Sequence, residues 1–192
     1  MAALEERMMR VCWVIAEGYK LDPTVDIDKI KSVGPTWGSW RTWRGCNTDN
    51  VICHTRTKAQ ELINRAFQAV CNFYIPKKYY QDLNRPVRVK LYEGEFEQDL
   101  DHPEDVIALH LASSENDIVL MLGYDLSKIE IPSDPYEKHK LVNYHGLIRS
   151  IITANPEVQW VLVDHPEEFD KTYQNIPNLT RDTMENALKL LL

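Results

Sequence analysis

The segment from Gly34 to Gly45, GPTWGSWRTWRG, has the most unusual composition in this chain of 192 residues. Two tryptophans and two arginines fall at the spacing i, i+3, i+4, i+7, which places them on one face if the segment forms a helical turn. They are Trp37, Trp40, Arg41 and Arg44. Indole rings stack on bases, sugars and cations, and a guanidinium group binds phosphate or carboxylate in a planar fork. The pattern predicts a ligand-binding surface, and the alternative is a packing layer whose arginines pair with surface acids.

A second candidate is the run His54–Lys58, HTRTK, which joins the end of a predicted strand to the start of a predicted helix. The free backbone N–H groups of a helix N-terminus, together with two cations, could hold a phosphate. The alternative is that Thr55 or Thr57 only caps the helix. Neither GxGxxG nor GxxxxGK[ST] occurs in the chain, which excludes the standard dinucleotide fingerprint and the P-loop.

Acidic residues concentrate between Glu93 and Asp105, where EGEFEQDLDHPED holds seven acids in thirteen residues. Asp99 and Asp101 could bind a divalent ion that bridges to a diphosphate, although a solvated acidic loop has the same composition. The cysteine spacing shows no CxxC pair and there is no HExxH motif, so no zinc site is expected. The cofactor therefore stays open, with a divalent metal as one choice.

Two histidines, His139 and His145, lie near the start of a helix predicted over residues 137–154. Either could act as a general base, and an ordinary surface histidine is the alternative for each. The chain has no GxSxG elbow or other recognisable nucleophile motif.

Alternating strands and helices must position these groups. Strands are predicted at residues 10–17, 50–54, 87–91, 117–122 and 158–163, and helices after residues 55, 103, 137 and 181. This order predicts a single α/β domain over residues 1–192, with an open, doubly wound, mostly parallel five-stranded sheet. The tryptophan-rich segment is then an insertion after the first strand. Ligands of such sheets bind at the carboxyl ends of the strands, near Glu17, His54, Glu93, Asp125 and Asp164.

The bulk composition is that of an ordinary globular domain, with 44% hydrophobic and 27% charged residues. The apolar runs are far shorter than the ~20 residues of a membrane helix, and the N-terminus lacks the pattern of a secretory signal. Four scattered cysteines predict reduced thiols and a cytoplasmic location, with no membrane partner.

The net charge of −7 is unevenly distributed along the chain. Residues 1–90 carry 15 Lys and Arg against 9 Asp and Glu, whereas residues 91–192 carry 7 against 20. Such asymmetry predicts an anionic ligand near the basic half, an acidic face for a partner, or a homo-oligomer, and two solvated surfaces are the alternative. A general nucleic-acid binder is disfavoured, because such domains are usually basic overall.

The run from Glu104 to Val163 resembles the Rossmann-like core shared by the bacterial sialyltransferases that use CMP-sialic acid and by the pterin-pyrophosphokinase-like family. The resemblance covers about sixty residues, including EDVIALHLASSEN, IVLMLGYDLS and HKLVNYHGLIRSIITANPEVQWVLV. It implies that Gly123, Tyr124 and Asp125 match a motif whose aspartate lies beside the bound nucleotide. It also implies that His139 stands where the sialyltransferases keep their catalytic histidine.

The chain departs from these families on the phosphate-binding side. Their glycine-rich G-x-G-P-S-L turn is replaced by AEGYKLDP, which keeps only Gly18, and their small Thr-Ser-Gly-like turn is replaced by Asp101-His102-Pro103. A second resemblance, to uncharacterised proteins of tailed phages, is carried by no particular motif.

The leading hypothesis is a nucleotide or nucleotide-sugar binding domain similar to a glycosyltransferase core, with transferase activity as an open question. The expected catalytic residues are His139 and Asp125. The expected nucleotide-binding residues are Gly18, Tyr19, Trp40, Arg41, Arg44, Gly123 and Tyr124. The alternative is a catalytically inactive interaction protein, such as a phage accessory protein, that acts through its acidic C-terminal half and its tryptophan-rich loop.

Overall fold

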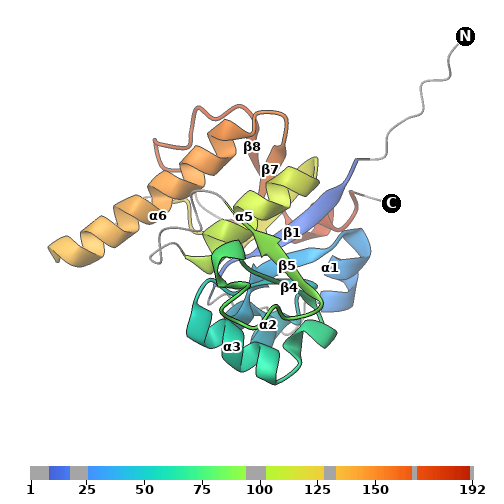
Figure 1. Ribbon diagram of the computed structural model, residues 1–192. Helices are drawn as coiled ribbons and strands as arrows, with labels where there is room; N and C mark the ends of the chain where they lie inside the picture. The colour runs from blue at the N-terminus through green and yellow to red at the C-terminus, as the bar shows by residue number, and fades with distance from the viewer. Residues whose placement is uncertain (1–8, 18–25, 94–102, 128–132, 166–167, 191–192) are drawn as a thin grey trace, which may run out of the picture.

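The computed structural model describes residues 9–17, 26–93, 103–127, 133–165 and 168–190. These residues form an α/β fold around one sheet of eight parallel strands, in the order β5-β4-β3-β2-β1-β6-β7-β8 (Figure 1). The strands are β1 (Val11–Ile15), β2 (Thr36–Ser39), β3 (Asn50–Ile52), β4 (Asn72–Pro76), β5 (Val89–Tyr92), β6 (Ile118–Leu122), β7 (Gln159–Val163) and β8 (Leu179–Asp182). The helices are α1 (Ile27–Val33), α2 (Trp40–Cys46), α3 (Arg56–Asn64), α5 (Glu104–Glu115), α6 (Pro135–Ala154) and α7 (Met184–Ala187), with 3-10 turns at Phe67–Ala69 and Lys77–Tyr79.

The predicted α/β class and parallel pairing are confirmed, but the prediction of five strands is wrong. The strands β2, β4 and β8 were not expected, and the tryptophan-rich segment is no insertion, because it forms β2 and most of α2. The strand β2 could not be recognised from the sequence, because its polar residues interrupt the apolar pattern of a buried strand. Thr36 is buried and shares three hydrogen bonds with Asp49, while the Ser39 hydroxyl accepts the Thr42 N–H and caps α2.

The C-terminal helix also differs from its prediction. Arg181 belongs to β8, and α7 begins only at Met184 after Thr183, whose hydroxyl accepts the Asn186 N–H. Four residues, LTRD, pair with β7 instead of opening a helix. Pairing with a buried neighbour has overridden the local helical pattern.

The sheet is covered on both faces, as the apolar character of its central strands predicts. All five residues of β1 are buried. One face of the sheet packs against α5 and α6, and the other against α1, α2, α3 and α7. The chain first builds β1 to β5 on one side of β1 and then returns through α5 to place β6 on the other side. The strand order therefore reverses between β1 and β6, which is where such sheets bind ligands.

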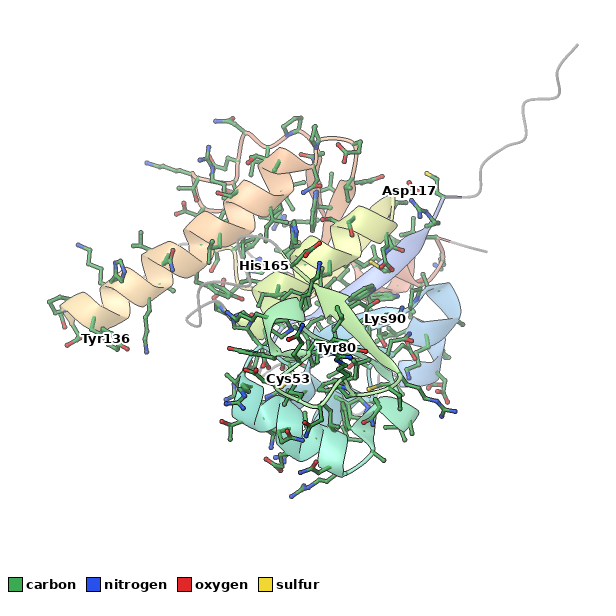
Figure 2. The ribbon with its side chains drawn as sticks, viewed as in Figure 1. Cys53, Tyr80, Lys90, Asp117, Tyr136 and His165 are labelled. Atoms are coloured by element: carbon green, nitrogen blue, oxygen red, sulfur yellow. The ribbon has the colours of Figure 1, made fainter. Side chains whose placement is uncertain are left out.

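The helix α6 extends beyond the body of the molecule. Figure 2 shows Tyr136 at its outer tip, where the side chain is 65% exposed. Within the described ranges, no helix combines the length and the apolar character needed to cross a membrane.

Candidate functional site

A cavity of about 730 Å³ opens at the carboxyl edge of β1, β2 and β3. Its volume lies in the range of small-molecule sites, roughly 300–1,000 Å³. The lining residues are Glu17, Trp40, Arg41, His54, Thr55, Lys58, Pro103, Glu104, Asp105 and Tyr144. They come from three strand ends, from the first turns of α2, α3 and α5, and from the middle of α6. The cavity therefore lies beside the point where the strand order reverses.

Cations surround the indole of Trp40 on one wall. Measured from the ring centroid, Lys58 Nζ lies at 4.1 Å, the Arg44 guanidinium carbon at 4.9 Å and that of Arg41 at 5.2 Å. We call these four residues the Trp40 cation cluster. Lys58 also pairs with Glu61 at 2.7 Å. The cluster holds positive charge in place beside the N-terminus of α3, which favours an anionic ligand group.

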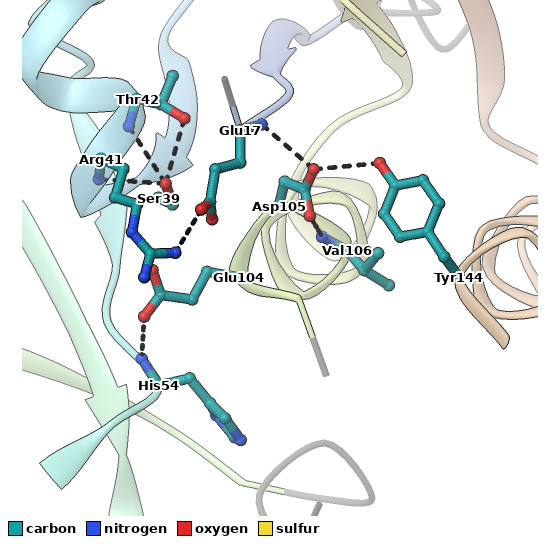
Figure 3. A network of polar contacts seen from close by, with 9 residues as sticks. All are labelled: Glu17, Ser39, Arg41, Thr42, His54, Glu104, Asp105, Val106 and Tyr144. Carbon is teal, nitrogen blue, oxygen red and sulfur yellow. Dashed lines mark hydrogen bonds and ion pairs between the residues drawn. The ribbon is translucent and has the colours of Figure 1, made fainter. Parts of the chain in front are cut away.

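The carboxyl group of Glu104 lies in the same cavity, between the Arg41 side chain and the His54 backbone (Figure 3). The side chain is 7% exposed, and its Oε1 accepts the backbone N–H of His54 at 2.8 Å. Its Oε2 is buried and has no hydrogen-bond partner among the described residues. Burial raises the pKa of Glu104 to about 7, and the negative charge of Glu17 adds to this rise, while the His54 N–H and Arg41 oppose it.

The neighbouring carboxyl group, Asp105, joins three elements. Its Oδ2 accepts the backbone N–H of Glu17 at 3.2 Å and the hydroxyl of Tyr144 at 3.1 Å, and its Oδ1 accepts the N–H of Val106 at 2.9 Å. Burial raises the pKa of Asp105, against the effect of these hydrogen bonds. Asp105 thereby fixes the end of β1 and the middle of α6 to the first turn of α5.

Arg41 and Glu17, which both line the cavity, form an ion pair (Figure 3). The Arg41 backbone is held at the start of α2, because its N–H donates to the Ser39 hydroxyl at 3.1 Å. The arginine side chain is 58% exposed, so it can change its partner at little cost.

A buried histidine lies close to these carboxyl groups. The ring Nδ1 of His54 is 2.6 Å from the hydroxyl of Tyr92, and one of the two atoms donates to the other. This contact attaches the end of β3 to β5. His54 is therefore held by Tyr92 through its ring and by Glu104 through its backbone N–H.

The structure brings together only part of the site that the sequence predicts. Trp40 and Arg41 line the cavity, and Arg44 contacts the Trp40 ring. Tyr124 is fully packed and donates to the Asp105 backbone carbonyl at 3.0 Å, so it supports the first turn of α5 from behind. Gly123 forms the turn after β6, with φ 81°. Gly18, Tyr19, Asp99 and Asp101 lie outside the described residues.

The two predicted catalytic residues, His139 and Asp125, are not among the residues that line the cavity. His139 is exposed on the outer part of α6. Asp125 is 81% exposed and contacts Ser127 and His165. The Ser127 hydroxyl group has the largest effect and lowers the pKa of Asp125. Burial opposes it, and the Ser127 N–H and His165 lower the pKa further.

The sequence places Glu104 and Asp105 at the end of an acidic run and Lys58 in the phosphate-binding candidate His54–Lys58, but Tyr144 was not singled out. The one signal for the acids was their place directly after Pro103, at the start of an apolar helix. That signal does not show burial. In the ranges that the structure describes, no group of three His, Cys, Asp or Glu side chains is arranged for a metal ion.

A more open cavity of about 590 Å³ lies at the ends of β7 and β8. It is lined by Asp164, His165, Arg181, Asp182 and Thr183. Its acids already have structural roles, because Asp164 accepts the Met184 N–H at 2.7 Å and Asp182 accepts the Thr183 N–H at 2.8 Å. It is therefore the weaker of the two candidates.

Function has to be inferred from the fold and from the cavity. No family model matches the chain, and neither a curated protein nor a solved structure is significantly similar to it.

Proposed function

We propose that this chain is a single Rossmann-like domain that binds a nucleotide or a nucleotide sugar in the cavity at the carboxyl ends of β1, β2 and β3. The observation that carries the proposal is the joint presence of the Trp40 cation cluster and a buried, partly unpaired carboxyl group in one cavity. A ligand that fits both must have an anionic part and a part rich in hydrogen-bond donors. A phosphorylated sugar meets both conditions.

The phosphate is assigned to the wall formed by Trp40, Arg41 and Lys58. Thr55 precedes α3 and its side chain makes no capping hydrogen bond, so the helix presents its first N–H groups without a side-chain acceptor from that residue. Because the Trp40 ring already contacts three cations, its role is to hold these cations and not to stack on a base. This wall lies where the charge asymmetry of the sequence predicts an anionic ligand.

The hydroxyl groups of the sugar and of an acceptor bound next to it are assigned to the carboxyl groups of Glu17 and Glu104. Carboxylate oxygens accept hydrogen bonds from hydroxyl groups, and such bonds are stronger than those between neutral groups. The Glu104 Oε2 is a free acceptor of this kind within the described part of the chain. A glycosyltransferase-like activity is consistent with this arrangement.

The test is a thermal-shift and calorimetry screen against nucleotides and nucleotide sugars, with and without Mg²⁺ or Mn²⁺. A ligand at 100 times its dissociation constant should stabilise the protein by roughly 2.7 kcal/mol, a shift of a few degrees. Lys58→Ala should abolish the shift. Lys189→Ala is the matched control, because both lysines pair with a glutamate of their own helical segment, at 2.7 Å and 2.6 Å.

The proposal is wrong if Lys58→Ala and Lys189→Ala bind the ligand equally well, or if no nucleotide or nucleotide sugar binds to the wild type. The comparison with and without metal decides whether a divalent ion is needed. A cytoplasmic location stays part of the proposal, and it is supported by four cysteines that form no disulfide bond.

The alternative of an inactive interaction protein receives separate support from α6. Tyr136 and Val142 are exposed on its outer half, at 65% and 52%. The tryptophans favour this alternative less, because Trp37 is buried and Trp43 packs on Phe67 with ring centroids 4.6 Å apart. Sedimentation at 0.1 M and 1 M salt tests it, since a charge-driven homo-oligomer should dissociate as the screening length falls from about 10 Å to about 3 Å.

A further inference from the structure

Glu104 is the most unusual titratable residue in the cavity. Buried polar atoms almost always have a hydrogen-bond partner, yet its Oε2 has none within the described residues. The other oxygen, Oε1, is fixed by the His54 N–H at 2.8 Å. The carboxyl group is thereby held in one orientation, with one acceptor unused at a site built for a ligand.

Titratable and charged groups from several elements lie around Glu104. They are Glu17 after β1, Arg41 at the start of α2, His54 after β3, Lys58 on α3, Asp105 on α5, Tyr144 on α6 and Tyr92 on β5. Burial is the largest influence, and with Glu17 it outweighs Arg41 and the His54 N–H. The resulting pKa of about 7 means that both protonation states are present near neutral pH, as acid–base catalysis requires.

We propose that Glu104 is the general base of a transfer reaction in this cavity, with Oε2 accepting the proton of the hydroxyl group that attacks the sugar carbon bonded to phosphate. The inference rests on the proposed function. The attacking oxygen forms a bond to the sugar carbon, and the bond from that carbon to the phosphate oxygen breaks with its electron pair. The nucleotide leaves with one more negative charge, and Glu104 later releases its proton to water.

The Trp40 cation cluster stabilises the charge that develops on the leaving phosphate. Arg41 contributes by changing its partner from Glu17 to the phosphate. Arg41 lowers the pKa of Glu104. When Arg41 moves away to the phosphate, the pKa of Glu104 rises, so its carboxylate becomes a stronger base. A water molecule can take the place of the acceptor hydroxyl group, and the same step then hydrolyses the donor to free sugar and nucleotide.

Donor hydrolysis provides a test that does not need the natural acceptor. The probes are UDP-glucose, UDP-N-acetylglucosamine, GDP-mannose and CMP-sialic acid, with binding measured by calorimetry and nucleotide release by chromatography. Glu104→Gln keeps the shape and the acceptor for the His54 N–H but cannot take a proton. We expect it to bind the donor within about 3-fold of the wild type and to release nucleotide about 100-fold more slowly or less.

The pH profile separates a base from a merely structural residue. The wild-type rate should rise with pH through about 7 as Glu104 ionises, whereas the residual rate of Glu104→Gln should lack this rise. Glu115→Gln, in the last turn of the same helix and exposed, is the control and should keep the wild-type rate and profile.

Two results overturn the inference while leaving the proposed binding function intact. One is a donor that binds to the wild type but is not hydrolysed, and the other is a Glu104→Gln variant that releases nucleotide at the wild-type rate. If none of the four donors binds, the proposed function fails first and the inference falls with it.

Discussion

The hydroxyl of Tyr144 donates a hydrogen bond of 3.1 Å to Oδ2 of Asp105, the same oxygen that accepts the Glu17 N–H at 3.2 Å. A single buried carboxylate oxygen thus attaches α6 to the end of β1. Tyr144 lines the cavity beside it, so the contact belongs both to the core and to the candidate site.

Replacing Tyr144 with phenylalanine should weaken both the stability of the fold and the binding of a ligand in the cavity. Tyr144→Phe removes one hydrogen bond to a buried acceptor and keeps the ring, so we expect a loss of about 1 kcal/mol in the free energy of unfolding. Nucleotide affinity should fall as well, because Glu17 loses part of its support. Urea denaturation and calorimetry measure the two effects. Tyr136→Phe, on the exposed tip of the same helix, should change neither.

Glu104 should make the stability of the protein depend on pH. Its pKa is about 7 in the folded state against an ordinary value of 4.5, so the folded state binds more protons between these values. The free energy of unfolding should therefore fall as pH rises from about 4.5 to about 7, by on the order of 3 kcal/mol from this group.

Glu104→Gln removes this dependence. The difference in the free energy of unfolding, variant minus wild type, should therefore be more favourable to the variant at pH 8 than at pH 4. Urea titrations of both proteins across this range give the difference, in which the contributions of other groups cancel. Parallel curves for the two proteins would show that Glu104 titrates normally.

Substitutions at Asp125 and Arg41 test two possible ligand sites. Asp125 belongs to the site that the family resemblance predicts, and Arg41 belongs to the cavity at the ends of β1, β2 and β3. Arg41 lines the cavity, whereas Asp125 is exposed and bonded to Ser127 and His165. We expect Arg41→Ala to abolish nucleotide binding and Asp125→Ala to retain it. Calorimetry with the best ligand of the screen decides the matter. Loss of binding only in Asp125→Ala would return the site to the carboxyl end of β6.

Gly34 should tolerate no side chain, for steric reasons. A Cβ atom built there would lie 2.1 Å from the carbonyl oxygen of Val11 and 2.8 Å from its carbon, both backbone atoms of β1. Gly34→Ala should therefore destabilise the protein by at least about 3 kcal/mol, because the central strand would have to move. Gly146→Ala on α6 meets no atom within 4 Å and should stabilise by about 0.5–1 kcal/mol. Thermal denaturation of the two variants should show shifts of opposite sign.

The sequence by itself determined the class of fold and the middle of the sheet. The strands β1, β6 and β7 are apolar on both faces, which is typical of strands covered on both sides. It also pointed to Trp40 and Arg41 as ligand-binding residues, from their type and spacing. The strand β2 was not predicted, because two of its four residues are polar and are satisfied by partners far away or in the next helix.

Only the tertiary structure decided what the acids of α5 do. In the sequence, Glu104 and Asp105 are two ordinary acids in a first turn, where solvent exposure is the default. Their burial follows from the packing of α5 across β1, β2 and β3, which brings the N–H groups of Glu17 and His54 to them from strands about 50 or more positions away in the chain. Desolvation depends on every element around a group, so no local pattern of residues can report it.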